Sequence, residues 1–190
     1  MISQQAISGL ETLFEHSIHE HSAHGQSGRS QVARRAQQDF LAGESPRHLV
    51  VQSISSYMFR IVTLFNFGKD MPMRSHLAAI LRSTSARMEG SALLDGYAEL
   101  ANLICGSVNR GLSAVFPHAG MSTPFALDHA CEQYVALLNP TLTHAYQIET
   151  DQAARFNMLV CICVARGSRL DFAIDQSAEA QSGSGELELF

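Results

Sequence analysis

A line of polar side chains marks the segment 93–116, LLDGYAELANLICGSVNRGLSAVF, whose apolar spacing predicts one long helix. Successive members of the line stand four or three positions apart, so they share one side of a helix. The line consists of Asp95, Glu99, Asn102, Gly106, Asn109 and Ser113. The opposite side is broadly apolar and indicates a face packed on a core. The line is therefore either an ordinary solvated face or a surface presented to a partner.

The composition of the line favours a partner surface. No lysine or arginine lies between Asp95 and Asn109, although solvated helix faces commonly carry charge pairs that support the helix. Gly96 and Gly106 each cost about 1 kcal/mol relative to alanine in a helix. The small side chains around the line predict low relief, which would let another protein's backbone approach closely. Glu99 and Asn102 are expected to project together from this surface.

A carboxylate and an amide one turn apart suit phosphoryl hydrolysis. The Asn102 amide can both donate to and accept from one water molecule and so hold it in place. The Glu99 carboxylate can pair with a lysine or arginine of a partner. Placing a water in line with a phosphoryl group is most of what such hydrolysis requires, because a metal ion commonly supplies the electrostatics.

The stretch DGYAELANLICG, residues 95–106, resembles the signature of the CheC/CheX family, phosphatases that act on the chemotaxis response regulator CheY. That signature is an Asp or Ser, three residues, a Glu, two residues, an Asn, and a proline about 22 residues later. It is matched by Asp95, Glu99, Asn102 and Pro124, and Gly106 is also usual in the family. The resemblance covers about 75–175, with a single motif copy that is more similar to CheX.

The resemblance implies a role for each matching residue. Glu99 and Asn102 would be the catalytic pair: Asn102 would orient the attacking water, and Glu99 would pair with the regulator's active-site lysine. Asp95, Gly106 and Pro124 would shape the site. The chain would need no cofactor of its own, since the Mg2+ would belong to the partner, a phosphorylated CheY-like response regulator. A homodimer is expected, because relatives of CheX are commonly dimers.

Two other classes of function use the same features. The chain could be a non-catalytic adaptor that docks a response regulator through the same helix face, giving affinity without a change in phosphate lifetime. It could also be a dimeric structural module with a sheet edge as its interface. In that third class, Glu99 and Asn102 could both be replaced without loss of partner binding.

Two other clusters could carry chemistry. Four histidines gather near the predicted end of the first helix and are weak candidates for a Zn2+ or Ni2+ site: His16, His19, His21 and His24. The simpler interpretation is a polar helix terminus whose histidines suit the C-terminal dipole. Ser122 and Thr123 near His118 and His129 could support nucleophilic catalysis, but the sequence has neither a Gly-x-Ser-x-Gly elbow nor a Gly-rich phosphate loop.

Composition narrows the class of protein. With 190 residues, 46% of them hydrophobic, the chain can build a globular core. A net charge of -5 and a single lysine, Lys69, disfavour a nucleic-acid surface. The longest apolar run, 158–165, is too short to span a membrane, and the first residues lack the basic start of a signal peptide. We therefore expect a cytoplasmic protein. Its four cysteines fit a reducing compartment, and Cys161 and Cys163 are expected to be small buried hydrophobes.

The rest of the chain predicts a mixture of helices and strands. Helices are expected at 2–19, at about 32–43, at 75–83 and along the motif segment. Strands are expected at about 48–54, 57–67, 131–138, 142–149, 155–166 and 170–175. Both faces of 155–166 are apolar, which is typical of a central strand covered on both sides.

This order of elements predicts an α+β, CheC-like fold with long helices on one side of a mostly antiparallel β-sheet. We expect a single domain over 1–175, whose residues 1–45 form a divergent N-terminal helical region. Residues 176–190 are expected to be a flexible acidic tail.

Overall fold

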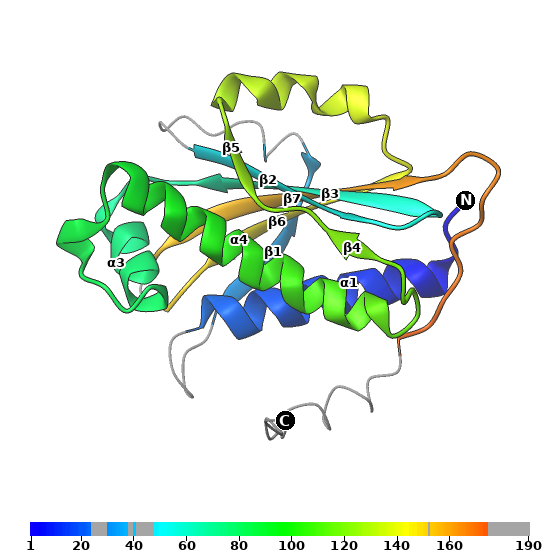
Figure 1. Cartoon of the computed structure of the whole chain (residues 1–190), viewed down its shortest axis with the longest axis horizontal. Helices are drawn as coiled ribbons and strands as arrows, with labels where there is room; N and C mark the ends of the chain where they lie inside the picture. Colours follow the sequence, from blue (N-terminus) through cyan, green and yellow to red (C-terminus); the bar gives the residue numbers. More distant parts are fainter. Residues whose placement is uncertain (24–29, 38–39, 41–47, 152, 175–190) are drawn as a thin grey trace, which may run out of the picture.

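The computed structural model of the chain describes residues 1–23, 30–37, 40, 48–151 and 153–174 (Figure 1). Two long helices and one antiparallel sheet dominate these residues. In chain order the elements are α1 Gln4–Ser22, β1 Gln31–Arg35, β2 His48–Ser55, β3 Phe59–Phe67, α3 Met71–Ile80, the 3-10 helix η1 Ser85–Arg87, α4 Gly90–Ser113, β4 Gly120–Met121, β5 Phe125–Leu127, the 3-10 helix η2 His129–Leu138, β6 Leu142–Glu149 and β7 Arg155–Val164.

The seven strands form one sheet in the order β1-β6-β7-β3-β2-β4, and β5 also pairs with β2. Every strand pair is antiparallel. Figure 1 shows α1 and α4 across one face of this sheet and η2 across the other. The predicted α+β fold with long helices against a mostly antiparallel sheet is confirmed, with one short helix added on the second face.

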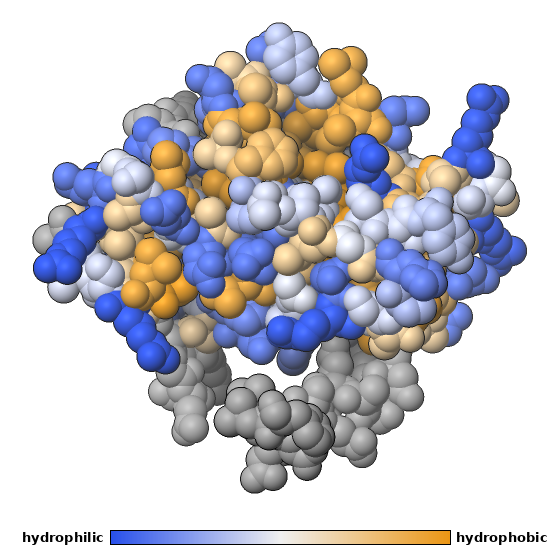
Figure 2. Space-filling model, in the orientation of Figure 1, coloured by the Kyte–Doolittle hydropathy of each residue, from blue (hydrophilic) through white to orange (hydrophobic). Residues whose placement is uncertain are grey.

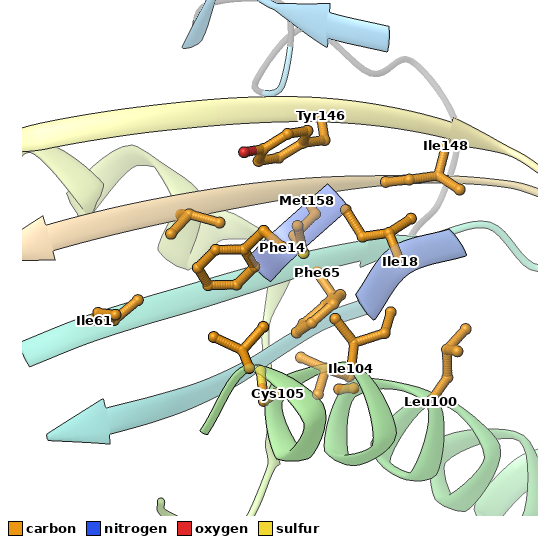
Figure 3. Close-up of a cluster of buried hydrophobic side chains, with 14 of the residues drawn as sticks. Phe14, Ile18, Ile61, Phe65, Leu100, Ile104, Cys105, Tyr146, Ile148 and Met158 are labelled. Atoms are coloured by element: carbon orange, nitrogen blue, oxygen red, sulfur yellow. The ribbon is translucent and has the colours of Figure 1, made fainter. Parts of the chain in front are cut away.

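The main core lies between the sheet and the two long helices. Alternate residues of β7, among them Phe156, Met158 and Val160, point to this face because successive side chains of a strand point to opposite sides. Figure 3 shows Phe14 and Ile18 of α1 and Ile104 of α4 converging on the sheet. All three helix side chains are fully or almost fully buried. This core fixes how α4 sits on the sheet.

A smaller core lies on the opposite face of the sheet. Leu159 and Cys161 of β7 pack there with Val135 of η2. The prediction that β7 is a central strand covered on both faces is therefore confirmed. Cys161 is buried as expected, and burial raises the pKa of its thiol to about 12. Cys163 is only partly buried.

The prediction of a strand at 131–138 is wrong, because this segment is η2. Its ends carry helix caps: the Asp128 carboxylate accepts a hydrogen bond from the Ala130 backbone N–H at 2.8 Å, and Asn139 adopts the left-handed conformation with φ 44°. The Glu132 carboxylate points inward and accepts a hydrogen bond from Asn66 at 2.7 Å. The capping residues Asp128 and Asn139 are present in the sequence. They favour a helix more strongly than the weak apolar alternation of 131–138 favours a strand.

Two other predicted elements also differ. The start of the helix predicted at about 32–43 instead belongs to the edge strand β1, because its backbone pairs with β6 and Arg34 reaches Glu11 and Glu15 of α1 at 2.8 and 2.7 Å. Most of the remainder of that predicted helix lies outside the described residues. The predicted final strand at 170–175 is reduced to one bridge between Ile2 and Leu170. The proposed tail, 176–190, also lies outside the described residues.

The other predicted helices and strands are present close to the expected positions. The helix predicted at 2–19 is α1, and the one predicted at 75–83 overlaps α3. The strands predicted at 48–54, 57–67, 142–149 and 155–166 are β2, β3, β6 and β7. The motif helix is α4, which ends before Pro117 as expected. The prediction of a single domain over 1–175 stays a prediction.

Candidate functional site

The motif helix α4 is fixed by its neighbours from several sides. The Tyr97 hydroxyl donates to the Gly68 carbonyl just after β3 at 2.6 Å, and its ring stacks on Phe67 with centroids 4.8 Å apart. From α1, the buried Ser17 hydroxyl donates to the Ile104 carbonyl at 2.6 Å. Burial raises the pKa of Tyr97. The residues between these anchors, including Glu99 and Asn102, therefore stand on a rigid support.

Gly96 serves packing inside the molecule. It is buried, and a Cβ at this position would lie 3.2 Å from the Leu77 Cβ of α3. The expectation that Gly96 helps a partner to approach is therefore wrong: it lets α3 approach α4. At Gly106, by contrast, an added Cβ would meet nothing within 4 Å, so of these two glycines Gly106 is the one that faces open space.

The Asn102 side chain is held from below by Gln52. Gln52 lies on β2 with 0% of its surface exposed, and its Nε2 donates to the Asn102 Oδ1 at 3.2 Å. A carbonyl oxygen has two lone pairs, so the Asn102 Oδ1 can still accept a second hydrogen bond. Sequence reasoning missed Gln52. The sequence pattern that could have revealed Gln52 is a polar amide between Val50 and Ile54, two apolar residues on the same face of a strand.

Glu99 lies one turn before Asn102 on the same side of α4 and is partly buried. Among the described residues, its carboxylate has no hydrogen-bond or ion-pair partner. Asp95, one turn earlier, is exposed. The structure thus brings Glu99 and Asn102 together on one accessible surface, as the spacing predicts, with Asp95 at its margin.

Pro124 lies where the edge of the sheet is interrupted. β4 pairs with β2 through Met121 and β5 through Phe125, and Ser122, Thr123 and Pro124 connect them without pairing as a strand. Proline has no backbone N–H and suits such an interruption. The Ser122 carbonyl instead accepts a hydrogen bond from the Gln52 side chain at 2.9 Å. The Asn102 and Pro124 ends of the motif are thereby joined through one buried amide.

The motif residues do not line either of the two described cavities. One cavity of about 330 Å3 is lined by residues such as Arg35 and Tyr146, and another of about 310 Å3 lies near Tyr57. Beside α4, Figure 2 shows an apolar patch over β5 and η2. Its exposed members are Phe125, Leu127, Tyr134, Leu137 and Leu138. An open face beside an apolar patch fits a protein partner better than a small ligand.

The three candidate histidines among the described residues are not assembled into a metal site. The His19 Nδ1 lies 2.8 Å from the Ser30 hydroxyl, whereas the His21 Nε2 lies 2.7 Å from the Ser107 hydroxyl. His16 is exposed, and His24 lies outside the described residues. Within the described ranges, no three His, Cys, Asp or Glu side chains are grouped to hold a metal.

The alternative nucleophiles also lack an activating base in the described part of the chain. The Ser122 hydroxyl donates to the Thr123 carbonyl at 3.0 Å and accepts from the Ser53 N–H at 3.0 Å. His129 lies beside Glu132 at 3.4 Å. Cys105 of α4 is fully buried, and burial raises the pKa of its thiol to about 12. The surface of α4 that carries Glu99 and Asn102 is therefore the best-supported candidate site.

Helices long and apolar enough to cross a membrane are absent from the described residues. The sequence matches no protein-family model and no curated protein. Solved structures, however, share its architecture.

Three of these solved structures cover most of the chain. A chain of the CheX–CheY–BeF3–Mg2+ complex from Borrelia burgdorferi has a TM-score of 0.58 at 7% identity, covering 83% of this chain and 97% of that one. A CheC-like superfamily protein from a Shewanella species has a TM-score of 0.53 at 9% identity, covering 84% and 98%. The FliM middle domain from Vibrio alginolyticus has a TM-score of 0.52 at 8% identity, covering 82% and 92%. The chain therefore has the fold shared by the CheC-like and CheX chemotaxis proteins, as the motif resemblance implied.

Proposed function

We propose that the chain is a phosphatase of the CheC/CheX type that hydrolyses the aspartyl phosphate of a CheY-like response regulator. The observation that carries this proposal is the arrangement of Glu99 and Asn102. They share one accessible face of a rigidly held helix, and the Asn102 amide is anchored to the sheet by Gln52. The fold and the matching motif support the same function.

In the proposed reaction, the Asn102 amide holds a water molecule in line with the phosphorus atom of the phosphorylated aspartate. The water oxygen bonds to phosphorus as the bond from phosphorus to the aspartate oxygen breaks. The aspartate returns as a carboxylate, and inorganic phosphate is released. Glu99 pairs with a lysine of the regulator and sets the position of Asn102. Mg2+ bound by the regulator neutralises the charge on the phosphoryl oxygens.

Solved structures of the same fold support a CheY-like receiver domain as the partner. A structure of the same fold contains CheX together with CheY, BeF3 and Mg2+. The open face around Asn102 and the neighbouring apolar patch suit docking of a protein domain. We infer from these features that a receiver domain covers α4 and carries the phosphoryl group to Asn102.

The second candidate function is a non-catalytic adaptor that binds a receiver domain through the same face. The observation favouring it is that the open face around Asn102 and the neighbouring apolar patch account for docking without hydrolysis, and a fold alone does not specify a reaction. The two functions differ in one measurable quantity, the lifetime of the phosphoryl group in the presence of the chain. An adaptor would bind the phosphorylated receiver and leave this lifetime unchanged.

The test is the decay of phosphorylated receiver domains from the same organism, labelled with acetyl phosphate, with and without the chain. We expect wild type to accelerate the decay of one receiver and Asn102→Ala to lose at least about 100-fold of that acceleration, since a misplaced nucleophile costs on this order. Asn109→Ala, on the same helix, is the matched control and should retain activity. Wild-type activity in Asn102→Ala would refute the catalytic assignment, and unchanged decay with tight binding would favour the adaptor.

A further inference from the structure

A fully buried amide lies beneath the proposed catalytic asparagine. Gln52 belongs to β2, and its neighbours on the same face, Val50 and Ile54, are part of the main apolar core. Burying an amide in such surroundings is costly unless its polar atoms are hydrogen-bonded. The Gln52 Oε1 is buried and has no hydrogen-bond partner among the described residues. An apolar side chain would avoid this cost, so packing alone does not account for Gln52.

The Nε2 of Gln52 makes two contacts, and both lead to the site. It donates to the Asn102 Oδ1 at 3.2 Å and to the Ser122 carbonyl at 2.9 Å. Ser122 is itself fixed to β2, because its N–H donates to the Ser53 carbonyl at 2.9 Å. Gln52 thus connects the motif helix to the interrupted edge of the sheet that contains Pro124.

This contact has a direct effect on the asparagine. A partly buried side-chain amide without an anchor would rotate about its terminal torsion, which is soft. The hydrogen bond from Gln52 fixes the Asn102 Oδ1 toward the sheet and thereby directs the Nδ2 away from Gln52. The Nδ2 and the second lone pair of Oδ1 then keep a defined orientation for one water molecule.

We propose that Gln52 is a positioning residue that holds the Asn102 amide in the orientation required to place the attacking water. The proposal rests on the proposed phosphatase function. It assigns Gln52 no contact with the regulator, so its loss should slow the chemical step without weakening the docking of the regulator.

The test compares Gln52→Met with wild type in the receiver-decay assay. Methionine has a similar length and flexibility but cannot donate a hydrogen bond. We expect kcat to fall by roughly 10- to 100-fold, since misplacement of a reacting group costs on this order, while KM for the phosphorylated receiver changes by less than about 2-fold. The matched control is Thr63→Val, which alters the buried residue opposite Gln52 on β3. It should retain wild-type kcat.

A double-mutant cycle separates positioning from an independent effect. If Gln52 acts through Asn102, Gln52→Met should cause no further loss in an Asn102→Ala background. An additional loss there would overturn the proposal. Wild-type kcat in Gln52→Met, with Asn102→Ala inactive, would also overturn it while leaving the proposed function intact. Wild-type activity in Asn102→Ala would instead refute the function itself.

Nuclear magnetic resonance adds a readout that does not depend on activity. The side-chain amide signals of Asn102 are identified by their disappearance in Asn102→Ala. In Gln52→Met these signals should shift, because the hydrogen bond from the Gln52 Nε2 to the Asn102 Oδ1 is lost, whereas Thr63→Val should leave them unchanged. Unmoved Asn102 signals in folded Gln52→Met would contradict the proposal. If Gln52→Met does not fold, the same spectra recorded with Gln52→Leu, which also cannot donate a hydrogen bond, decide the question, with the same expected shift.

Discussion

At the scale of single residues, Glu99 has a carboxylate left available for a partner. Its neighbours on α4 are held by contacts inside the molecule, whereas no described residue pairs with Glu99. We expect Glu99→Gln to weaken binding of the BeF3-treated cognate receiver by roughly 10-fold or more, because a hydrogen bond to a charged group contributes about 1.5–3 kcal/mol. The melting temperature should not change. Isothermal titration calorimetry measures the affinity.

Asp95→Asn is the control for this measurement, since it removes the same charge from the same side of α4 at an exposed position one turn earlier. We expect the Asp95 variant to bind like wild type. Equal losses in the two variants would mean that the face contributes only general negative charge, and that Glu99 has no specific lysine partner.

The residue scale also shows what the sequence could predict about the site. The spacing of Glu99 and Asn102 was sufficient to place them together, because both belong to one helix. Gln52 was beyond such reasoning, since it is distant from Asn102 along the chain and meets it only when α4 packs on β2. The role of Gly96 was misassigned for the same reason: helical periodicity does not reveal which neighbouring helix approaches.

At the scale of elements, the packing of α3 on α4 depends on the absence of a side chain at Gly96. Gly96→Ala should destabilise the fold by up to about 2 kcal/mol, because overpacking against the buried Leu77 costs about 1–3 kcal/mol and the gain in helix propensity offsets about 1 kcal/mol of that cost. Urea unfolding measures the change. An increase in stability would show that α3 moves aside at no cost.

Gly106 on the same helix should respond in the opposite direction. An alanine there meets no neighbour, so Gly106→Ala should stabilise the fold by about 0.5–1 kcal/mol through helix propensity alone. The added methyl group would nevertheless stand on the outer face four residues after Asn102. We expect weaker binding of the receiver by the stabilised protein, measured by calorimetry. Unchanged affinity would place Gly106 outside the docking surface.

The elements also differ in how far sequence could predict them. α1, α4, β3 and β7 have strong periodicity and large buried faces, so local pattern and tertiary packing agree. The edge strand β1 is short and mostly exposed, and it is a strand because β6 offers its backbone a partner. Periodicity carries no information about such a partner. For η2, by contrast, the capping residues Asp128 and Asn139 were available and were the better guide.

At the scale of the whole molecule, partly buried histidines make stability depend on pH. Burial lowers the pKa of His144, an effect that Arg34 reinforces and that Glu11 and Glu15 oppose. Burial also lowers the pKa values of His21 and His48. A histidine in the unfolded chain, with a pKa of about 6.5, then binds a proton more readily than in the folded chain. This contribution to stability is present above that pH and is lost as the pH falls below it.

We therefore expect the free energy of unfolding in urea to decrease between pH 7.5 and pH 5.5. In His144→Gln the decrease should be smaller, because the substituted side chain does not titrate. Identical slopes in wild type and His144→Gln would rule out His144 as a source of the pH dependence.

The expected homodimer also belongs to this scale and stays a prediction. The two edges of the sheet indicate which surface a homodimer would use as its interface. β1 carries Arg34 and Arg35, and the opposite edge is interrupted around Pro124, and both features disfavour pairing of sheets edge to edge. Light scattering after size-exclusion chromatography measures the oligomeric state, and a monomer would remove the structural-module alternative.

The pairing of β3 with β7 has a consequence for how the molecule folds. The hairpins β2–β3 and β6–β7 each join strands that are neighbours in sequence, whereas Phe67 of β3 must find Phe156 of β7 across the whole segment that contains α4. Distant pairings of this kind form slowly because the loop must close before the contacts are gained. During refolding, helical circular dichroism should therefore recover before the proposed phosphatase activity does. The last step to be completed would be the joining of the two hairpins.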